Sequence, residues 1–223
     1  MRGLVCASLF CAWFALVPAA GAIPARAQSQ PLSQLVFTLD GRYNSMHSWE
    51  ADFVQTYTNG LQSRTESGRL YLQKPGRMRW DYLQPVHKQF IVNGDSIWQY
   101  TAGQPEASLT RIKDARDLRT PLRFLLGHTD LPKELSGLSY SGLKPWHPGD
   151  YVIYGRPNPD EAGSWREVWI EITPAYEIDR LIIVGVDGSR NDIRLSHIKP
   201  NVELPGKLFH FTPPPGVRVV PGA

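Results

Sequence analysis

The side chains that could carry out acid–base, nucleophilic or metal chemistry are scattered along this chain. The six histidines stand singly, at His47, His87, His128, His147, His197 and His210. A structural or catalytic metal site needs such ligands in close, recurring spacings, and these intervals do not provide one. Both cysteines, Cys6 and Cys11, lie in the apolar N-terminal stretch, so no thiol nucleophile follows it. The sequence therefore predicts no metal and no cofactor.

Short catalytic motifs are also missing from the sequence. It contains no Gly-x-Ser-x-Gly elbow, no phosphate-binding Gly-x-x-x-x-Gly-Lys-Ser/Thr loop, no His-Glu-x-x-His pair and no Gly-x-Gly-x-x-Gly turn. Carboxylates such as Asp81 and Glu171 could approach one another in space, so a hydrolase built on such a pair stays open as the least favoured class. We predict that the protein is not an enzyme.

The N-terminus has the form of a cleaved signal peptide. Arg2 precedes an apolar run from Leu4 to Val17, and Ala25-Arg26-Ala27 ends the segment with a small-x-small cleavage pattern. The run is shorter than the ~20 residues that span a bilayer, although an uncleaved anchor remains the alternative. Val5 and Phe10 precede the two cysteines, where a lipid-attachment signal needs a small residue. We therefore expect residues 1–27 to be removed and residues 28–223 to form one exported, soluble, thiol-free domain.

Charge argues against nucleic acid as a partner. The 24 basic residues include Arg2 and Arg26, which leaves 22 against 21 acidic residues after cleavage. A nucleic-acid-binding domain carries a basic face or stripe, and here acidic residues are interspersed with the basic ones.

The spacing of apolar residues changes from a helical period to a two-residue period near Ser48. Helical spacing predicts a helix over residues 31–43, with Pro31 in its first turn. From Ser48 onward the period becomes two, as in residues 77–82, where Met78, Trp80 and Tyr82 alternate with charges. Such alternation is typical of antiparallel strands with one dry face. We predict strands at 49–57, 69–73, 77–82, 88–92, 96–101, 151–155, 166–173, 177–186, 191–197 and 208–211.

A short, very apolar helix is predicted inside this run of strands. Residues 117–127 combine a capping Thr120, Pro121 in the first turn and a terminating Gly127. The simplest role for the many aromatic residues on the strands is to fill a core. A curved sheet covered by such a helix could also form a container for acyl chains, because each buried methylene contributes about 0.8 kcal/mol. From the residues alone, the protein is a β-rich exported protein that could bind a hydrophobic ligand.

Five segments in order resemble the family of periplasmic outer-membrane lipoprotein carrier proteins of the Lol pathway, the LolA family. They cover most of the chain after the signal peptide, and each is a weak motif by itself. They are the strand Ala51–Thr56, the block Ser67–Trp80, the hairpin Ile91–Tyr100, Thr120-Pro121 followed by Leu125-Leu126, and the terminus Phe209–Pro214.

The resemblance implies an incomplete antiparallel β-barrel of about eleven strands, with a helical lid over a hydrophobic cavity. It implies a monomeric periplasmic carrier without a cofactor. Such a carrier takes triacylated lipoproteins from an inner-membrane ABC transporter, shields their acyl chains and delivers them to an outer-membrane receptor. The receptor itself shares this fold but is lipid-anchored, which the missing attachment signal disfavours. A lipid-binding paralogue with a regulatory or other lipid-transfer role is the remaining alternative.

The resemblance also assigns roles to individual positions. Lys74 stands where the family commonly has an arginine that holds the lid shut, with Arg77 as a possible substitute and a solvated turn residue as the alternative. Arg123 is expected on the outer face of the lid, and residues 144–164 form a loop without a clear counterpart. The predicted cavity residues are Phe53, Leu70, Leu72, Met78, Trp80, Phe90 and Trp98, and the predicted lid residues are Pro121, Leu122, Leu125 and Leu126.

Overall fold

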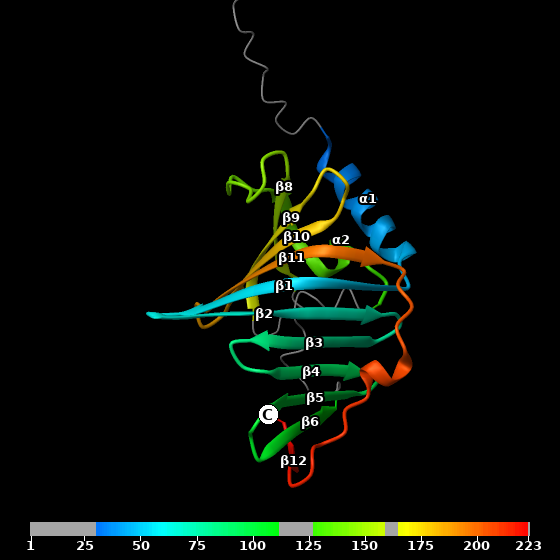
Figure 1. The fold of residues 1–223 in the computed structure, drawn as a ribbon. Coiled ribbons are helices and arrows are strands. Elements are labelled where there is room, and N and C mark those ends of the chain that lie inside the picture. Colours follow the sequence, from blue (N-terminus) through cyan, green and yellow to red (C-terminus); the bar gives the residue numbers. More distant parts are fainter. Residues whose placement is uncertain (1–29, 112–126, 159–164, 223) are drawn as a thin grey trace, which may run out of the picture.

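A single, largely antiparallel sheet dominates the computed structural model, which describes residues 30–111, 127–158 and 165–222 (Figure 1). Its strands are β1 (Ser48–Asn59), β2 (Gln62–Gln73), β3 (Arg77–Gln84), β4 (Lys88–Asn93), β5 (Ser96–Thr101), β6 (Glu106–Arg111), β7 (Leu135–Tyr140), β8 (Tyr151–Pro157), β9 (Trp165–Ile172), β10 (Ile178–Gly185), β11 (Arg190–Pro200) and β12 (Arg218–Pro221). The helical elements are α1 (Leu32–Ser45), α2 (Leu131–Glu134) and the 3-10 turn η5 (Gly206–Phe209).

The sheet is open. Its twelve strands follow the order β12-β6-β5-β4-β3-β2-β1-β11-β10-β9-β8-β7, so β12 and β7 lie at opposite ends. Every neighbouring pair is antiparallel except β12 with β6. The predicted incomplete β-barrel class is confirmed, with twelve strands in place of about eleven. β1 and β11 join the two halves of the chain at the middle of the sheet.

The predicted N-terminal helix is confirmed as α1, which begins one residue later and ends two residues later than expected. Pro31 occupies the position before the helix, and its carbonyl accepts hydrogen bonds from the backbone N–H groups of Gln34 and Leu35. The apolar stripe buries Leu35, Val36, Leu39 and Tyr43 against the sheet. Figure 1 shows α1 running along one end of the strands. We call the face of the sheet that α1 covers the inner face.

The two-residue period correctly assigns side chains to the two faces. On β3, Met78 and Trp80 are buried on the inner face, while Arg77, Arg79 and Asp81 point to the other side, which we call the outer face. Arg79 holds the Asp81 carboxylate at 2.8 Å and donates to the carbonyl of Leu208 at 2.7 Å. The charged side of β3 therefore fastens the C-terminal segment onto the outer face.

The β elements differ from the predictions in three ways: one predicted strand is wrong, three strands were missed, and β8 lies inside the loop expected over residues 144–164. The strand expected at 208–211 is η5 followed by extended chain, because Pro205 O accepts from Leu208 N and starts a tight turn. β6, β7 and β12 were not predicted at all. Small and polar residues such as Ser108, Thr110 and Ser139 weaken the alternation there, and β12 follows a proline-rich stretch.

The helix predicted over residues 117–127 lies almost entirely outside the described residues, which include only its last position, Gly127. Within the described ranges, every helix is too short or too polar to cross a bilayer.

A substitution at Gly68 on β2 tests the close approach of β2 and β3. A Cβ atom at this position would lie 1.8 Å from the carbonyl oxygen of Asp81 on β3, where the register shifts between Ser67 and Gly68. The carbonyl belongs to the backbone and cannot move aside without breaking the ladder. We expect Gly68→Ala to lower the free energy of unfolding by about 1–3 kcal/mol in urea denaturation.

Gly41, on the exposed side of α1, is the matched control, because a Cβ atom added there would meet nothing within 4 Å. We expect Gly41→Ala to raise stability by about 0.5–1 kcal/mol, because alanine restricts the unfolded chain and favours helix. Equal effects from the two substitutions would contradict the close β2–β3 approach at Gly68.

Candidate functional site

A continuous apolar interior lies between the inner face of the sheet and α1. Five of the predicted cavity residues come together there, each at most 4% exposed: Phe53, Leu70, Leu72, Met78 and Trp80. A sixth, Phe90, is half-buried and packs against them. The interior continues through Val168, Ile170, Leu181 and Ile193 on the other half of the sheet. The structure therefore brings together six of the seven residues predicted to line the cavity.

Strand register explains why these residues meet. Leu70, Trp80 and Phe90 are direct cross-strand partners on β2, β3 and β4, and Leu72 pairs with Met78 one step along. Phe53 faces Gly68 across β1 and β2, and its ring packs edge-on against Trp80 at 4.7 Å between centroids. Edge-to-face contacts of this kind favour one arrangement over a loose apolar pool. The part of the interior under β1–β4 is thus aromatic and well ordered.

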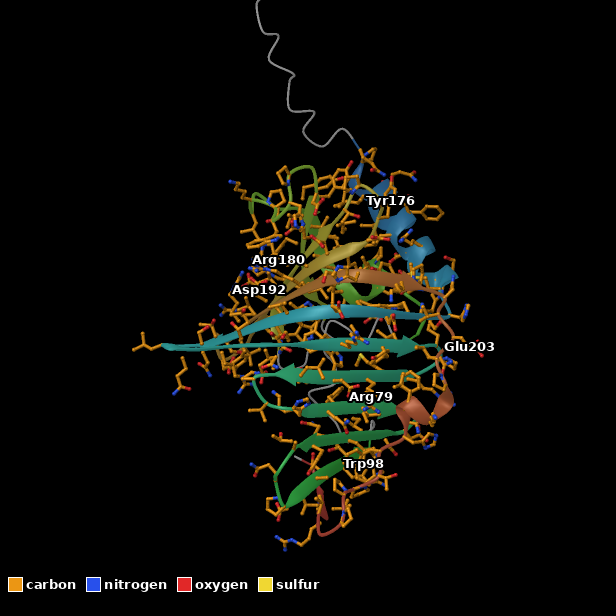
Figure 2. All side chains as sticks on the ribbon, in the orientation of Figure 1. Arg79, Trp98, Tyr176, Arg180, Asp192 and Glu203 are labelled. Atoms are coloured by element: carbon orange, nitrogen blue, oxygen red, sulfur yellow. The ribbon has the colours of Figure 1, made fainter. Side chains whose placement is uncertain are left out.

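Trp98 is the exception among the predicted cavity residues. Its neighbour Ile97 is buried in the interior, so Trp98 points to the outer face by the two-residue period. There it packs with Ile91 and lies 5.1 Å from the ring of Phe211, and its position is labelled in Figure 2. The prediction was wrong because the hairpin motif identifies the strand but not which of its two faces the tryptophan joins.

A groove of about 600 Å³ lies beside α1 at the border of the interior. One wall is α1, and the other is formed by residues 128–132 and β7. Leu32, Val36 and Leu138 line the groove and also belong to or pack against the interior cluster. Phe37 lines it as well and is 74% exposed. The volume lies within the roughly 300–1,000 Å³ typical of ligand pockets.

Polar contacts cross the groove between α1 and the segment before α2. The side chain of Asn44 donates to the carbonyl of Thr129 at 2.8 Å and accepts from its N–H at 2.7 Å. The carboxylate of Asp40 accepts from Leu131 N–H at 3.2 Å. Burial raises the pKa of Asp40 to about 6, and the nearby Asp130 adds to the shift, although the hydrogen bond from Leu131 opposes it. The ionised form of Asp40 therefore lowers the stability of the contact between α1 and residues 128–132.

Lys74 contacts the far end of α1. Its Nζ donates to the carbonyl of Tyr43 at 2.6 Å, and partial burial lowers the pKa of the amine. Tyr43 is buried, and its hydroxyl accepts from Ile178 N–H on β10 at 3.0 Å. Arg77, the alternative latch residue, donates to Gln73 on its own hairpin. The basic residue before Pro75 thus ties the end of α1 to the β2–β3 turn.

The predicted lid cannot be compared with these contacts. Pro121, Leu122, Arg123, Leu125 and Leu126 all lie outside the described residues. Their assigned role stays a prediction from the sequence.

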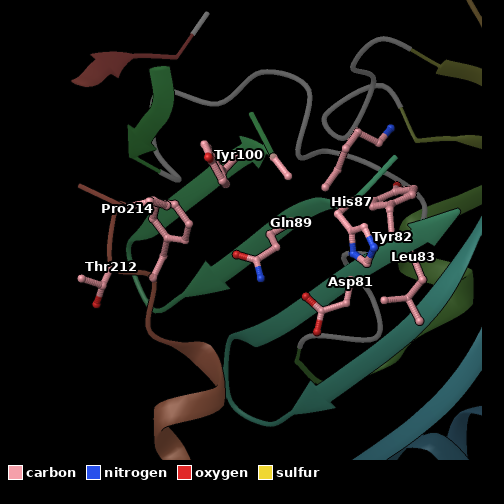
Figure 3. A pocket seen from close by; sticks show the side chains of 11 residues that line it. Asp81, Tyr82, Leu83, His87, Gln89, Tyr100, Thr212 and Pro214 are labelled. Carbon is pink, nitrogen blue, oxygen red and sulfur yellow. The ribbon is translucent and has the colours of Figure 1, made fainter. Parts of the chain in front are cut away.

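A second pocket, of about 350 Å³, lies where the ends of β3, β4 and β5 meet the C-terminal segment (Figure 3). Its lining mixes charged and polar side chains, including Asp81, His87 and Gln89, with the rings of Tyr82 and Phe211. This pocket was not predicted from the sequence. Polar groups lose hydration when covered, so this pocket suits an acyl chain less well than the groove beside α1, where Asp40, His128 and Asp130 also line the walls but most of the exposed surface is apolar.

The fold and this interior define an open-sheet β protein whose long helix α1 covers an apolar core. Among solved structures, a conserved protein from Thermus thermophilus superposes with a TM-score of 0.54 at 13% identity, covering 86% of this chain and all of that one. That likeness concerns the fold alone.

Sequence comparison identifies the family. The model for "outer membrane lipoprotein carrier protein LolA" matches residues 44–212. An outer-membrane lipoprotein carrier protein of Methylococcus capsulatus is 30% identical over 199 residues, covering 87% of this chain and 89% of the relative. Its counterpart in Chromobacterium violaceum is 28% identical, covering 91% and 93%. The chain belongs to the LolA family of outer membrane lipoprotein carrier proteins.

The raised pKa of Asp40 gives the α1 junction a defined pH dependence. Between its ordinary value of 3.8 and about 6, the folded chain binds the Asp40 proton more tightly than the unfolded chain does, so this group lowers stability as the pH rises through that window. Asp40→Asn keeps an acceptor for Leu131 N–H and removes the charge. We expect it to be more stable than the parent at pH 7.5 by about 1 kcal/mol, discounted for partial exposure.

The difference should vanish below pH 4, as measured by urea denaturation across the pH range. Asp95→Asn, in the exposed β4–β5 turn, serves as the control and should leave the pH profile of the parent unchanged. A constant difference between Asp40→Asn and the parent at all pH values would contradict the assignment.

Proposed function

We propose that this protein is a periplasmic carrier that shields the acyl chains of lipoproteins in its apolar interior during transfer to the outer membrane. The observation that carries the proposal is the groove beside α1, where Leu32, Val36 and Leu138 belong to or pack against the buried cluster of the inner face. In this account a triacylated lipoprotein comes from an inner-membrane ABC transporter and passes to an outer-membrane receptor. The names of the relatives support the choice of lipoprotein as cargo.

Sequestration of acyl chains needs apolar surface and little else. Each methylene moved from water into an apolar site contributes about 0.8 kcal/mol, so a long chain gains enough to be held without specific polar contacts. The groove offers exposed Phe37 and partly buried Leu32 and Leu138 for this purpose. The carrier needs no cofactor of its own, because hydrophobic transfer involves no bond making. ATP hydrolysis belongs to the transporter.

Release of the acyl chains requires that the interior can open at a modest cost in free energy. Polar contacts that hold α1 to its surroundings include those of Tyr43 with Lys74 and Ile178, of Asn44 with Thr129, and of Asp40 with Leu131. A carrier works when its closed and open states differ by only a few kcal/mol. We assign the adjustable boundary to α1 and residues 128–132, and by resemblance to a lid containing Pro121, Leu122, Leu125 and Leu126.

Export fits the same account. Removal of residues 1–27 places the domain in the periplasm and eliminates Cys6 and Cys11. The carrier then has no site for lipid attachment, which distinguishes a soluble shuttle from an anchored receptor. We propose that it acts as a monomer.

The direct test is release of a lipoprotein from spheroplasts. Purified protein added to spheroplasts that synthesise a triacylated lipoprotein should recover that lipoprotein in the supernatant as a one-to-one soluble complex. Membrane retention of the lipoprotein, under conditions where a relative named as a carrier releases it, would contradict the proposal. Extraction of free phospholipid without lipoprotein would instead favour the alternative of a general lipid-binding paralogue.

Phe37→Glu tests the groove without disturbing the core. Phe37 is 74% exposed, so its replacement should leave the fold intact, but a carboxylate at the groove opposes entry of an acyl chain because it must lose hydration. We expect lipoprotein release to fall at least tenfold. Val54→Glu, at a 42% exposed position on the outer side of β1, is the control and should release lipoprotein like the parent. Equal activity of all three proteins would exclude the groove as the binding site.

Lys74→Met and Arg77→Met distinguish the two possible latch residues. Lys74→Met removes the donor to Tyr43 O, and hydrogen bonds from charged donors contribute about 1.5–3 kcal/mol before allowance for exposure. We expect Lys74→Met to lower thermal stability and to lose bound lipoprotein several times faster in a dilution assay. Arg77→Met, which interrupts the contact with Gln73, should behave like the parent. Normal retention in Lys74→Met would show that Lys74 is only a turn residue.

A further inference from the structure

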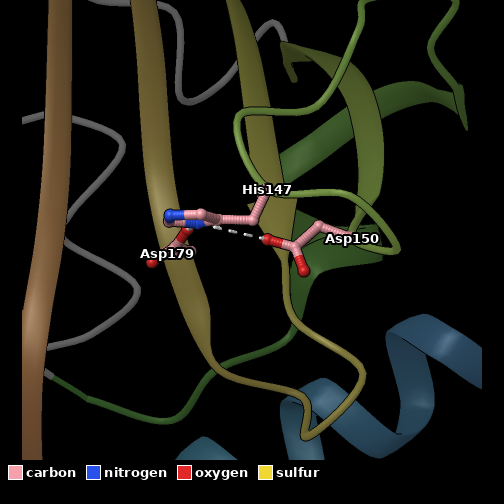
Figure 4. A group of neighbouring side chains, drawn as sticks. All are labelled: His147, Asp150 and Asp179. Carbon is pink, nitrogen blue, oxygen red and sulfur yellow. Dashed lines mark hydrogen bonds and ion pairs between the residues drawn. The ribbon is translucent and has the colours of Figure 1, made fainter.

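The outer face carries a cluster of metal-ligating side chains that lies apart from the apolar interior. His147, Asp150 and Asp179 offer one imidazole nitrogen and two carboxylate oxygens, all within 4.8 Å of one another (Figure 4). His147 Nδ1 lies 2.6 Å from Asp179 Oδ2 and 3.9 Å from Asp150 Oδ2. The three residues come from the loop before β8 and from β10, so the sequence spacing alone could not reveal them.

The burial of Asp150 is the observation that points to a missing ligand. Its side chain is only 4% exposed, and Oδ2, the oxygen that faces His147, has no hydrogen-bond partner among the described residues. A buried, charged oxygen without a partner is costly, and native structures normally satisfy such groups with a donor or a cation. The imidazole of His147 is 59% exposed, which leaves the opposite side of the cluster open to water.

The surrounding charges also favour a cation. The carboxylates of Asp150 and Asp179 face a single imidazole, and the carboxylate of Glu171 lies next to the same loop on β9. A nearby guanidinium, that of Arg180, is engaged by Asp192 on β11 at 2.6 Å and stands 3.7 Å from Glu171. Negative charge therefore collects at the cluster with no lysine or arginine in ion-pair contact with Asp150 or Asp179 among the described residues.

Local backbone structure holds the ligands in place. The backbone N–H groups of Trp146 and His147 both donate to Glu171 Oε1, which fixes the loop against β9. Trp146 also stacks on Arg194, whose guanidinium lies 3.6 Å from the ring centroid. The register shift between Ile178 and Arg180 makes Asp179 an extra residue on β10, and such bulges redirect a side chain.

We propose that His147, Asp150 and Asp179 form a divalent transition-metal site of the zinc type on the outer face. One imidazole and two carboxylates are three protein ligands for Zn²⁺, with the remaining position left to water at the exposed side. An imidazole ligand disfavours Ca²⁺ and Mg²⁺, which prefer oxygen-only sites. Ligand atoms in a tetrahedral zinc site are about 3.3 Å apart, so on binding the His147 and Asp179 ligand atoms separate from 2.6 Å, and Asp150 Oδ2 moves closer to His147 Nδ1 than 3.9 Å.

The bound ion links the loop before β8 to β10. Its role is structural and independent of lipoprotein binding, because the cluster lies on the opposite face of the sheet from the groove. A metal that binds only the folded state raises stability by mass action.

Calorimetric titration of Zn²⁺ into the untagged protein, purified from periplasm and stripped with EDTA, tests the proposal. We expect one equivalent to bind and the midpoint of thermal unfolding to rise. His147→Ala and Asp150→Asn should each weaken the Zn²⁺ affinity at least tenfold. His197→Ala is the matched control, because His197 forms a similar pair with Asp52 at 3.0 Å outside any three-ligand cluster of the described residues, and it should bind like the parent.

Folding of the variants is checked in EDTA. Asp150→Asn removes a buried charge from a negative environment, so it should unfold at the same temperature as the stripped parent or higher. Co²⁺ in place of Zn²⁺ should give visible absorption bands of a low-coordinate site in the parent and not in His147→Ala. Zn²⁺ affinity unchanged in His147→Ala, or no stoichiometric binding by the parent, would overturn the proposal.

Discussion

The packing of α1 against the inner face of the sheet is the interaction on which the rest of this structure depends. An open antiparallel sheet leaves one apolar face without a second sheet to cover it, and here one amphipathic helix covers part of that face through Leu35, Val36, Leu39 and Tyr43. Tyr43 links that packing to two parts of the sheet, since its hydroxyl accepts from Ile178 and its carbonyl accepts from Lys74. A single helix on a wide sheet covers less apolar surface than a second sheet would. The boundary beside it is therefore the natural place for a ligand to enter.

The two faces of the sheet are built differently. The inner face is apolar and contains the aromatic contacts of Phe53 with Trp80 and Tyr82. The outer face combines charged networks, such as Arg180 with Asp192, with two covering segments, the loop around Trp146 and the C-terminal turn η5. Packing of these two segments also contributes to the free energy of folding, so the stability does not depend on the inner face alone.

The sequence predicted the parts of this fold that depend on local periodicity. The helix over 31–43 and the inner position of Met78 and Trp80 follow from spacing alone, because burial of one face imposes it. The prediction of a strand over residues 208–211 was wrong, because the alternation of Phe209 and Phe211 fits a strand and a tight turn equally well. Which face a strand presents is a question of register with its neighbours, and that is why Trp98 was misplaced. The metal-ligating cluster forms because the loop before β8 crosses the outer face and brings His147 and Asp150 next to Asp179. Local sequence patterns do not predict such contacts between distant segments.

We propose that the acyl chains of a lipoprotein enter beside α1, on the inner side of the sheet. Photo-crosslinking measures this directly, with benzoylphenylalanine placed at Phe37 in the groove or at Phe211 on the outer face. Both replacements substitute one aromatic side chain for another. We expect a crosslink to triacylated lipoprotein from position 37, little from position 211, and none from either position to the same lipoprotein lacking its acyl chains. Crosslinking from position 211 that equals or exceeds that from position 37 would contradict it.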